Sequence, residues 1–329
     1  MDRRTFLHTL GAAPLISSLR LQSRERGAES PASHRLDESG AVARRLDDDS
    51  VARPLQGRDG PHKAVLISML PKSASYAERF AIARDAGFEA VEMQTVMRDE
   101  EAAEARDASK TSGMRIHSVM NMDHWRFPLS SADASVVQKS VAGMETSLRN
   151  AALWGADAVL LVPAVVDATT SYQDAWRRSQ QVIRERLLPM ARDLKVIVAI
   201  EEVWNKFLLS PIEFARYVDE LDSPLAKAYF DVGNVVFYGY PQDWIRTLGA
   251  RIAKVHIKDF QLDRPNGRFT WRNIGDGDVD WQEVRRALSD VGYGGYVTTE
   301  VAGGDAAYLK DLGNRVERFL AGKKPAGSN

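Results

Sequence analysis

Cysteine is absent from this sequence of 329 residues. The chain therefore has no disulfide bonds, no thiolate metal ligands and no cysteine nucleophile. An excess of one charge is also lacking, because 44 Lys and Arg residues stand against 45 Asp and Glu residues, for a formal net charge of -1. Such a balance provides no overall basic field that would draw the protein onto a nucleic-acid backbone. No internal stretch is long and apolar enough to cross a bilayer, so we expect no transmembrane span in the mature protein.

The first 20 residues, MDRRTFLHTLGAAPLISSLR, form a distinct segment. Arg3 and Arg4 precede Phe6 and a short, weakly apolar run, a pattern that resembles a twin-arginine export signal and predicts delivery to the periplasm or envelope. A disordered basic tail is the alternative reading. No clear A-x-A motif follows, so cleavage and retention as an anchor are both open. Residues 21–62 and 323–329 lack a sustained period and predict a disordered linker and a disordered tail.

Short apolar runs alternate with helix-length amphipathic segments from Ala64 onward. This alternation predicts parallel strands joined by crossover helices. Eight such units in about 260 residues match a (β/α)8 barrel, whereas an open doubly wound sheet usually has fewer strands and a glycine-rich first turn, which this chain lacks. We therefore predict a single domain, a TIM barrel over residues 63–322. Its strands are expected at residues 64–69, 89–94, 115–120, 157–162, 196–201, 226–231, 251–257 and 295–300.

Two helix ends and one turn can also be placed. Gly87 and Gly155 each follow a helix-length segment, at the position where glycine stops a helix. The motif GDGDVDW at residues 275–281 predicts a turn and a helix start, with Asp280 as the N-cap and no role in the chemistry.

Polar residues gather at the C-terminal ends of the predicted strands, which is the face of a TIM barrel where active sites lie. The last four of these residues end the fifth to eighth strands and are therefore neighbours around the barrel. The set is Glu92, His117, Glu201, Asp231, His256 and Glu300.

Three carboxylates and one imidazole make an oxygen-rich ligand set. Glu201, Asp231, Glu300 and His256 therefore predict one divalent metal ion, with Mn²⁺ favoured and Mg²⁺, Co²⁺ or Zn²⁺ as alternatives. A metal would also explain why an apolar strand ends in acids, since an unpartnered buried carboxylate costs several kcal/mol. The alternative is a carboxylate cluster neutralised by Lys254, Lys258 and arginines.

Four motifs carry a family resemblance that extends over about residues 64–320. They are AIEEVWNKFLLSP, YFDVGN, KVHIKDF and NIGDGDVDW followed by VTTEV, and they occur in this order. Together they resemble the xylose-isomerase-like sugar isomerase/epimerase superfamily, which includes tagatose/psicose 3-epimerases, hydroxypyruvate isomerase, inosose dehydratases and endonuclease IV. The resemblance implies that Glu201 and Glu300 both bind metal and exchange the substrate proton, and that Asp231 and His256 complete the metal site.

Two positions depart from the pattern of the epimerases. Aligning AIE favours Glu201 as the ligand from the fifth strand, whereas counting back from NKF favours Glu202. We take Glu201, and alternation along a strand then turns Glu202 toward the helix layer or the loop. Sugar epimerases often carry a histidine three residues after the aspartate of the sixth strand, but this chain has Asn234, which can hydrogen-bond a hydroxyl but cannot titrate.

Several further residues are predicted to bind substrate. The loop after the third strand supplies His124 as a proton donor and Trp125 as a face for stacking against a sugar. His117 is either a substrate contact or a satisfied core histidine, and Lys258 is either a substrate contact or half of a structural salt bridge with Asp259. The remaining predicted contacts are Asn205, Lys206 and Asn234.

These features predict a metal-dependent isomerase or epimerase that abstracts a proton next to the carbonyl of a keto-sugar or related polyol. The alternative is a dehydratase or lyase that uses the same metal site on 3-keto-glycosides or inosose-like substrates. A non-catalytic sugar-binding barrel is a third reading. A nucleic-acid enzyme of the endonuclease IV type is not expected, because its zinc site needs more histidines than the three of the predicted barrel. The expected partner is a small carbohydrate, and the oligomeric state is open.

Overall fold

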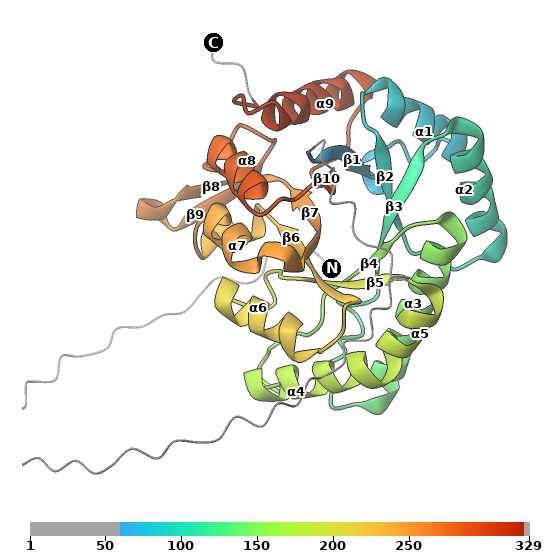
Figure 1. Cartoon of the computed structure of the whole chain (residues 1–329), viewed down its shortest axis with the longest axis vertical. Helices are drawn as coiled ribbons and strands as arrows, with labels where there is room; N and C mark the ends of the chain where they lie inside the picture. The colour runs from blue at the N-terminus through green and yellow to red at the C-terminus, as the bar shows by residue number, and fades with distance from the viewer. Residues whose placement is uncertain (1–59, 326–329) are drawn as a thin grey trace, which may run out of the picture. The chain divides into compact units, whose positions relative to one another are not determined.

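The computed structural model describes residues 60–325, and their strands close into a barrel (Figure 1). The predicted export signal lies outside the described residues, as does nearly all of the predicted linker. The strand order around the barrel is β1-β10-β7-β6-β5-β4-β3-β2, with parallel neighbours throughout. The predicted (β/α)8 architecture is therefore confirmed.

The eight barrel strands lie close to the predicted ranges. The largest difference is at β1, which starts two residues early and ends at Leu66, because residues 67–69 turn into a short 3₁₀ helix. The strands are β1 (His62–Leu66), β2 (Ala90–Gln94), β3 (Arg115–Met120), β4 (Ala158–Leu161), β5 (Ile197–Glu201), β6 (Ala226–Asp231), β7 (Ile252–Ile257) and β10 (Tyr296–Thr299).

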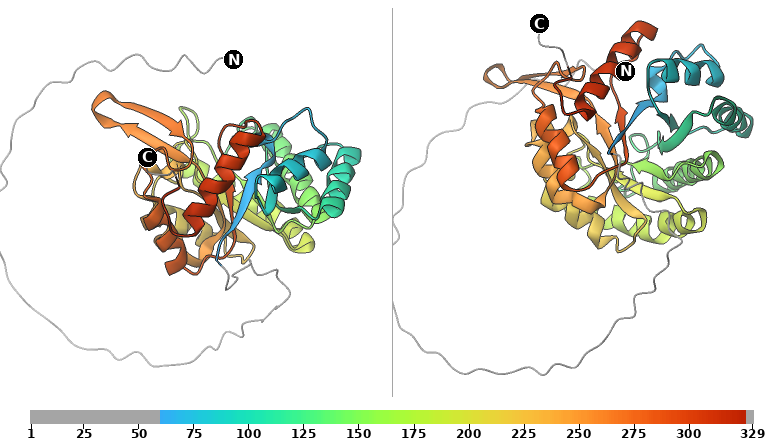
Figure 2. Two further views of the ribbon diagram at one scale, coloured as in Figure 1. Left: turned by 90° about the horizontal axis from the view of Figure 1, so that it is seen from above. Right: turned by 45° about the horizontal axis from the view of Figure 1, so that its top comes forward.

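Helices surround the barrel (Figure 2). Their ends follow local chemistry: Ser75 and Glu78 form a capping box at the start of α1, and Gly155 ends α3 in the left-handed conformation, with φ of 71°. Asp280 caps α8, as predicted, by accepting a hydrogen bond from the backbone N–H of Glu283. The helices are α1 (Tyr76–Asp85), α2 (Asp99–Ser112), α3 (Ala134–Trp154), α4 (Tyr172–Val182), α5 (Leu188–Leu194), α6 (Pro211–Glu220), α7 (Pro241–Leu248), α8 (Trp281–Asp290) and α9 (Ala306–Leu320).

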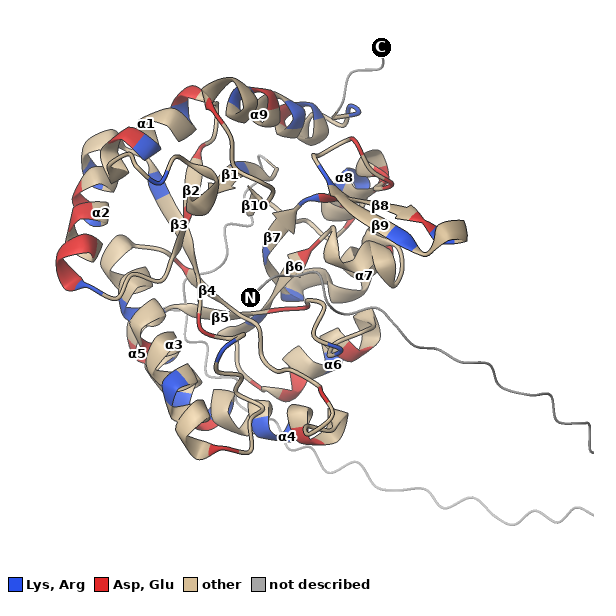
Figure 3. Cartoon of the chain, turned by 180° about the vertical axis from the view of Figure 1, so that it is seen from behind, with Lys and Arg blue, Asp and Glu red and all other residues tan. Residues whose placement is uncertain are grey.

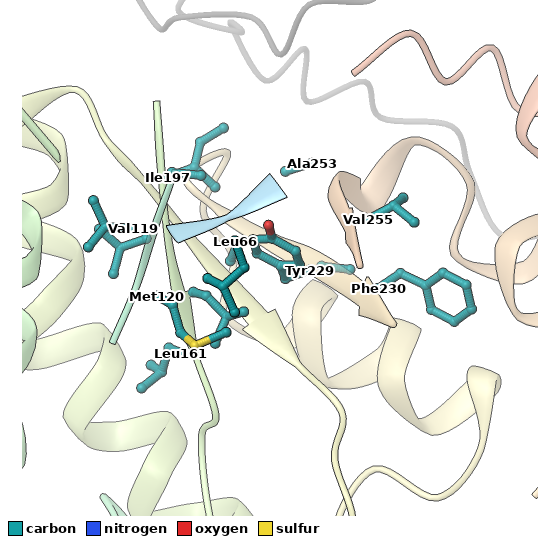
Figure 4. Close-up of a cluster of buried hydrophobic side chains, with 14 of the residues drawn as sticks. Leu66, Val119, Met120, Leu161, Ile197, Tyr229, Phe230, Ala253 and Val255 are labelled. Atoms are coloured by element: carbon teal, nitrogen blue, oxygen red, sulfur yellow. The ribbon is translucent and has the colours of Figure 1, made fainter. Parts of the chain in front are cut away.

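The apolar core lies on the strands and on the helix faces that cover them. Figure 4 shows part of this core, including Leu66, Val119, Ile197, Phe230 and Val255. Acidic and basic residues are interspersed on the outer helices (Figure 3), in agreement with the near-zero net charge. None of the helices within residues 60–325 has the length and apolar character that a membrane crossing requires.

A two-stranded hairpin interrupts the alternation after β7. Its strands are β8 (Asp259–Asp263) and β9 (Arg268–Arg272), which pair antiparallel with Phe260 opposite Trp271, and the hairpin stands out from the barrel (Figure 2). This hairpin was not among the elements predicted from the sequence. The strands DFQLD and RFTWR alternate polar and apolar residues, which is a strand signal, but neither contains the continuous apolar run expected of a buried barrel strand.

Candidate metal centre

Four side chains converge at the C-terminal end of the barrel. Glu201 and Asp231 are the last residues of β5 and β6, His256 is the fifth residue of β7, and Glu300 follows β10 directly. Because these four strands are consecutive around the barrel, their ends meet on one arc of its rim. One potential ligand atom from each residue lies within 4.8 Å of the others.

His256 is at the centre of this cluster and is fully buried. Its Nδ1 atom lies 3.0 Å from Glu201 Oε1, 3.4 Å from Glu300 Oε2 and 3.9 Å from Asp231 Oδ2. The Nδ1 side of the ring therefore faces the carboxylates of Glu201, Asp231 and Glu300.

The opposite side of the ring contacts Glu92 at the barrel interior. Glu92 Oε2 lies 2.6 Å from His256 Nε2, and both side chains are fully buried. A carboxylate at this distance holds a proton on Nε2, so Nδ1 is the ring atom that would bind a metal. Glu92 was among the acids at predicted strand ends but was not assigned to the site. The sequence signal that could have assigned it is its position inside the apolar strand run EAVEMQ, where an acid needs a buried partner.

Substitution of Glu92 tests this arrangement. We expect Glu92→Gln to weaken Mn²⁺ binding by about 10- to 100-fold, because the amide keeps the volume of the side chain but is a poorer partner for the imidazole N–H. Isothermal titration of the purified chain with Mn²⁺ measures the effect. Glu104→Gln, on the exposed side of α2, is the matched control and should bind Mn²⁺ as the wild type does. If the Glu92 variant and this control bind Mn²⁺ with equal affinity, Glu92 does not position His256 for metal binding.

Lys258 enters the cluster from the residue after β7. Its Nζ lies 2.7 Å from Asp231 Oδ2 and 2.5 Å from Glu300 Oε2. Gly233 makes room for this approach, since a Cβ atom there would lie 2.5 Å from the Cγ atom of Lys258. Burial opposes the charged form of Lys258, but the Asp231 and Glu300 carboxylates outweigh it and raise the pKa of the ammonium.

The alternative reading of Lys258 as half of a salt bridge with Asp259 is wrong, because Lys258 pairs with Asp231 and Glu300. The Asp259 carboxylate instead accepts hydrogen bonds from Trp281 Nε1 at 2.8 Å and from the backbone N–H of Gly275 at 2.9 Å. It thereby fastens the turn of the GDGDVDW motif. Lys254, the other predicted counter-charge, pairs with Asp157 at 2.6 Å and not with the cluster.

The two candidate proton-transfer groups have different acidities in the metal-free protein. Burial raises the pKa of Glu201 to about 7. Burial acts in the same direction on Glu300, but Lys258 and His256 outweigh it and lower the pKa of this carboxyl to about 2. Pairs of carboxyls whose environments separate their pKa values are common in sites that move protons.

Glu201, and not Glu202, is the residue that the structure places in the cluster. Glu202 is nevertheless buried and does not face an exposed loop. Its Oε1 accepts a hydrogen bond of 2.9 Å from the backbone N–H of Asp231, and burial, followed by the charge of Asp231, raises its pKa well above the ordinary value. The second acid of the pair thus ties the end of β5 to the end of β6.

The donor set fits a divalent cation. Glu92, Glu201, Asp231 and Glu300 surround one imidazole and one ammonium at a buried site, so negative charge is in excess. Carboxylate oxygens with a single imidazole nitrogen are the donors that Mn²⁺ and related ions accept.

The predicted substrate contacts divide into two groups. His124 is buried near Glu300, and burial lowers its pKa to about 4, so it is neutral at pH 7. Trp125 beside it is exposed, with the two rings 5.5 Å apart in an edge-on arrangement. Lys206 is exposed on the loop after β5. These three side chains keep polar or aromatic groups available on the side of the barrel that carries the cluster.

The other three predicted contacts are engaged within the fold. His117 is fully buried in the barrel interior, where its Nε2 lies 3.0 Å from Thr298 Oγ1, so the structure does not bring it to the cluster. The Asn205 amide donates to the carbonyl of Ala164. The Asn234 amide donates to the carbonyl of Glu202 at 2.9 Å. Each of these side chains is a structural link in this conformation.

Comparison with known proteins places this geometry in a family. A family model described as a xylose isomerase-like TIM barrel matches residues 80–317. Among curated proteins, the chain is 29% identical over 248 residues to a putative L-ribulose-5-phosphate 3-epimerase, SgbU, of Escherichia coli K12, covering 70% of this chain and 85% of that protein. It is 28% identical to L-ribulose-5-phosphate 3-epimerase UlaE of Escherichia coli, covering 69% and 82%.

Two solved structures have the same fold. The 3-keto-D-glucoside 4-epimerase of E. coli superimposes with a TM-score of 0.67 at 15% identity, covering 79% of this chain and 99% of that one. The D-allulose 3-epimerase of Methylomonas sp. gives a TM-score of 0.65 at 18% identity, covering 80% and 97%. The family match spans most of the barrel and both curated relatives match over most of their own length. The chain belongs to the xylose isomerase-like TIM barrel family.

Proposed function

We propose that this protein is a divalent-metal-dependent sugar epimerase or isomerase that moves a proton on the carbon next to a carbonyl. The observation that carries the proposal is the convergence of Glu201, Asp231, His256 and Glu300 within 4.8 Å at the active-site end of the barrel. The names of the curated relatives, which are sugar-phosphate 3-epimerases, support the reaction class.

The same four residues would hold the ion. When bound, a divalent ion polarises a carbonyl and makes the neighbouring C–H more acidic. The chain itself supplies the bases. Glu201 on β5 and Glu300 after β10 come from strands separated by β6 and β7, so their carboxyls approach the cluster from different sides. One carboxylate can take the proton from one face of the substrate carbon while the other acid returns a proton to the opposite face.

Lys258 and His124 can assist without carrying the transferred proton. The ammonium of Lys258 is held between two carboxylates and can donate a hydrogen bond to a substrate oxygen that gains negative charge. The neutral imidazole of His124 has a buried Nδ1 without a partner among the described residues, which leaves that atom available for a hydroxyl.

Proton NMR in D₂O tests the proposed function. Candidate ketopentoses, ketohexoses, their phosphates and 3-keto-glycosides are incubated with the Mn²⁺-loaded chain, which is removed before measurement. Deuterium at one carbon with a new configuration, or with a migrated carbonyl, is the expected result. Release of an aglycone or formation of an enone would instead identify an elimination, as in the lyase alternative. Absence of exchange in every substrate, although Mn²⁺ binds, would refute the proposal.

A further inference from the structure

A group of aromatic side chains lies beside the cluster of carboxylates and histidine, where the hairpin meets two loops of the barrel. We refer to it as the aromatic platform. Two of its rings come from β9, one from the start of β8, one from the loop after β5 and one from the 3₁₀ helix η3 (Asn234–Phe237) that follows β6. The platform consists of Trp204, Phe237, Phe260, Phe269 and Trp271.

The platform is held rigidly from below. Trp204 is its central ring, with centroid distances of 4.8 Å to Phe269, 5.1 Å to Trp271 and 5.3 Å to Phe260. Its indole Nε1 donates a hydrogen bond of 3.0 Å to the carbonyl of Asn234. Phe260 of β8 is fully buried and packs against both aromatic rings of β9. The outer rings therefore have little freedom to rearrange.

The outer rings are nevertheless open to solvent. Phe269, Trp271 and Phe237 are 48%, 43% and 47% exposed. Fixed aromatic rings with half of their surface uncovered form a contact face prepared in advance, since little conformational entropy is lost when a ligand covers them.

The platform is continuous with the proposed active site. Lys258 Nζ lies 5.2 Å from the centroid of the Trp271 ring, and the same atom lies 2.7 Å from Asp231 Oδ2. Trp204 is the third residue after Glu201. Trp271 is therefore joined to the carboxylates of the cluster through Lys258.

The chemistry of this face favours an uncharged ring. Lys258 is already paired with two carboxylates. Arg268 and Arg272 alternate with Phe269 and Trp271 along β9, so their side chains leave the strand on the face opposite the platform rings, where Arg272 donates to Gln261 Oε1 at 2.7 and 3.0 Å. A phosphate group would require free cationic donors, whereas the C–H face of a pyranose packs well on indole and phenyl rings.

We infer that the aromatic platform binds a second sugar ring attached to the ring that reacts, so that the substrate is a glycoside larger than a free monosaccharide. This inference rests on the proposed function, because it assigns the reacting ring to the cluster of Glu201, Asp231, His256 and Glu300. The platform would stack the apolar face of the outer pyranose on Trp271 and Phe269, and the cluster would hold the inner ring.

Binding of two stable probes tests the inference without turnover. The full chain is titrated with methyl β-cellobioside and with methyl β-D-glucopyranoside, by calorimetry and by saturation-transfer NMR. We expect the disaccharide to bind about tenfold more tightly, with saturation of its outer ring. Trp271→Ala should weaken disaccharide binding enough to abolish the difference, and Trp271→Phe should restore part of it. Tyr240→Ala, an exposed aromatic residue at the start of α7 outside the platform, is the control.

Three outcomes would overturn the inference. Equal affinity for both probes would remove the second-ring site. Tighter binding of glucose 6-phosphate than of the disaccharide would indicate a phosphosugar site. A dimer that Trp271→Ala dissociates in light scattering, with disaccharide binding unchanged, would make the platform an interface between two copies. None of these binding and light-scattering measurements depends on proton exchange in D₂O. If no substrate exchanges its proton, that result counts against the proposed function alone.

Discussion

Glu201→Gln is expected to lower kcat by at least about 10²-fold, the scale of general-base catalysis. The amide keeps the volume of the side chain and one ligating oxygen but removes both charge and basicity. Glu201 Oε1 lies 3.0 Å from His256 Nδ1 inside the cluster, so Mn²⁺ affinity should fall as well. Steady-state kinetics on the substrate identified by deuterium exchange and calorimetry with Mn²⁺ measure the two effects.

Glu202→Gln is the matched control one residue away. Burial and the charge of Asp231 raise its pKa well above the ordinary value, which favours the neutral carboxyl that glutamine resembles in shape. The amide oxygen can still accept the N–H of Asp231, and turnover should stay within about twofold. Glu202→Ala, in contrast, should cost about 1–3 kcal/mol of unfolding free energy because a buried N–H loses its partner. If the Glu202→Gln variant loses turnover and the Glu201→Gln variant stays fully active, Glu202 and not Glu201 is the base, and the assignment is contradicted.

Lys258→Met is expected to destabilise the metal-free protein by about 3 kcal/mol, because breaking a buried pair leaves Asp231 and Glu300 without their counter-charge. Mn²⁺ should recover much of this loss, since an ion bound only to the folded state stabilises it and replaces the missing positive charge. Urea unfolding of wild type and variant, each with EDTA and with Mn²⁺, gives the four free energies that are needed.

Lys206→Met controls for the loss of a lysine from the same side of the barrel. Lys206 is exposed, so its replacement should change stability by no more than about 0.5 kcal/mol with or without Mn²⁺. The interpretation of Lys258 would be contradicted if its methionine variant unfolded like wild type in EDTA, or if Mn²⁺ stabilised both proteins equally.

The barrel could be predicted because its strands are buried on both faces. Continuous apolar runs bounded by turns identify such strands, and each run was found within a few residues of its position. The four cluster residues followed from the same pattern, because strand order brings the ends of β5, β6, β7 and β10 together. Alternation indicated that only one of Glu201 and Glu202 points into the barrel, and the AIE motif favoured Glu201. Neither could show that Glu202 is buried.

Contacts between distant residues could not be predicted from local patterns. Glu92 and His256 are 164 positions apart, and only the closed barrel brings them to 2.6 Å. The amides of Asn205 and Asn234 were expected to face substrate, but each meets a backbone carbonyl from a neighbouring loop. The aromatic platform depends on the hairpin, whose short strands carry too few apolar residues to stand out.

The links between the ends of β5 and β6 have a mechanical consequence. Glu202 accepts the N–H of Asp231, Asn234 donates to the carbonyl of Glu202, and Trp204 donates to the carbonyl of Asn234. Three hydrogen bonds that cross in this way tie the two loops together, with two carboxylates of the cluster at one end and the central ring of the platform at the other. We therefore expect a displacement of Trp204 to move the carboxylates as well, and the amides of the two loops to exchange with solvent in one cooperative opening.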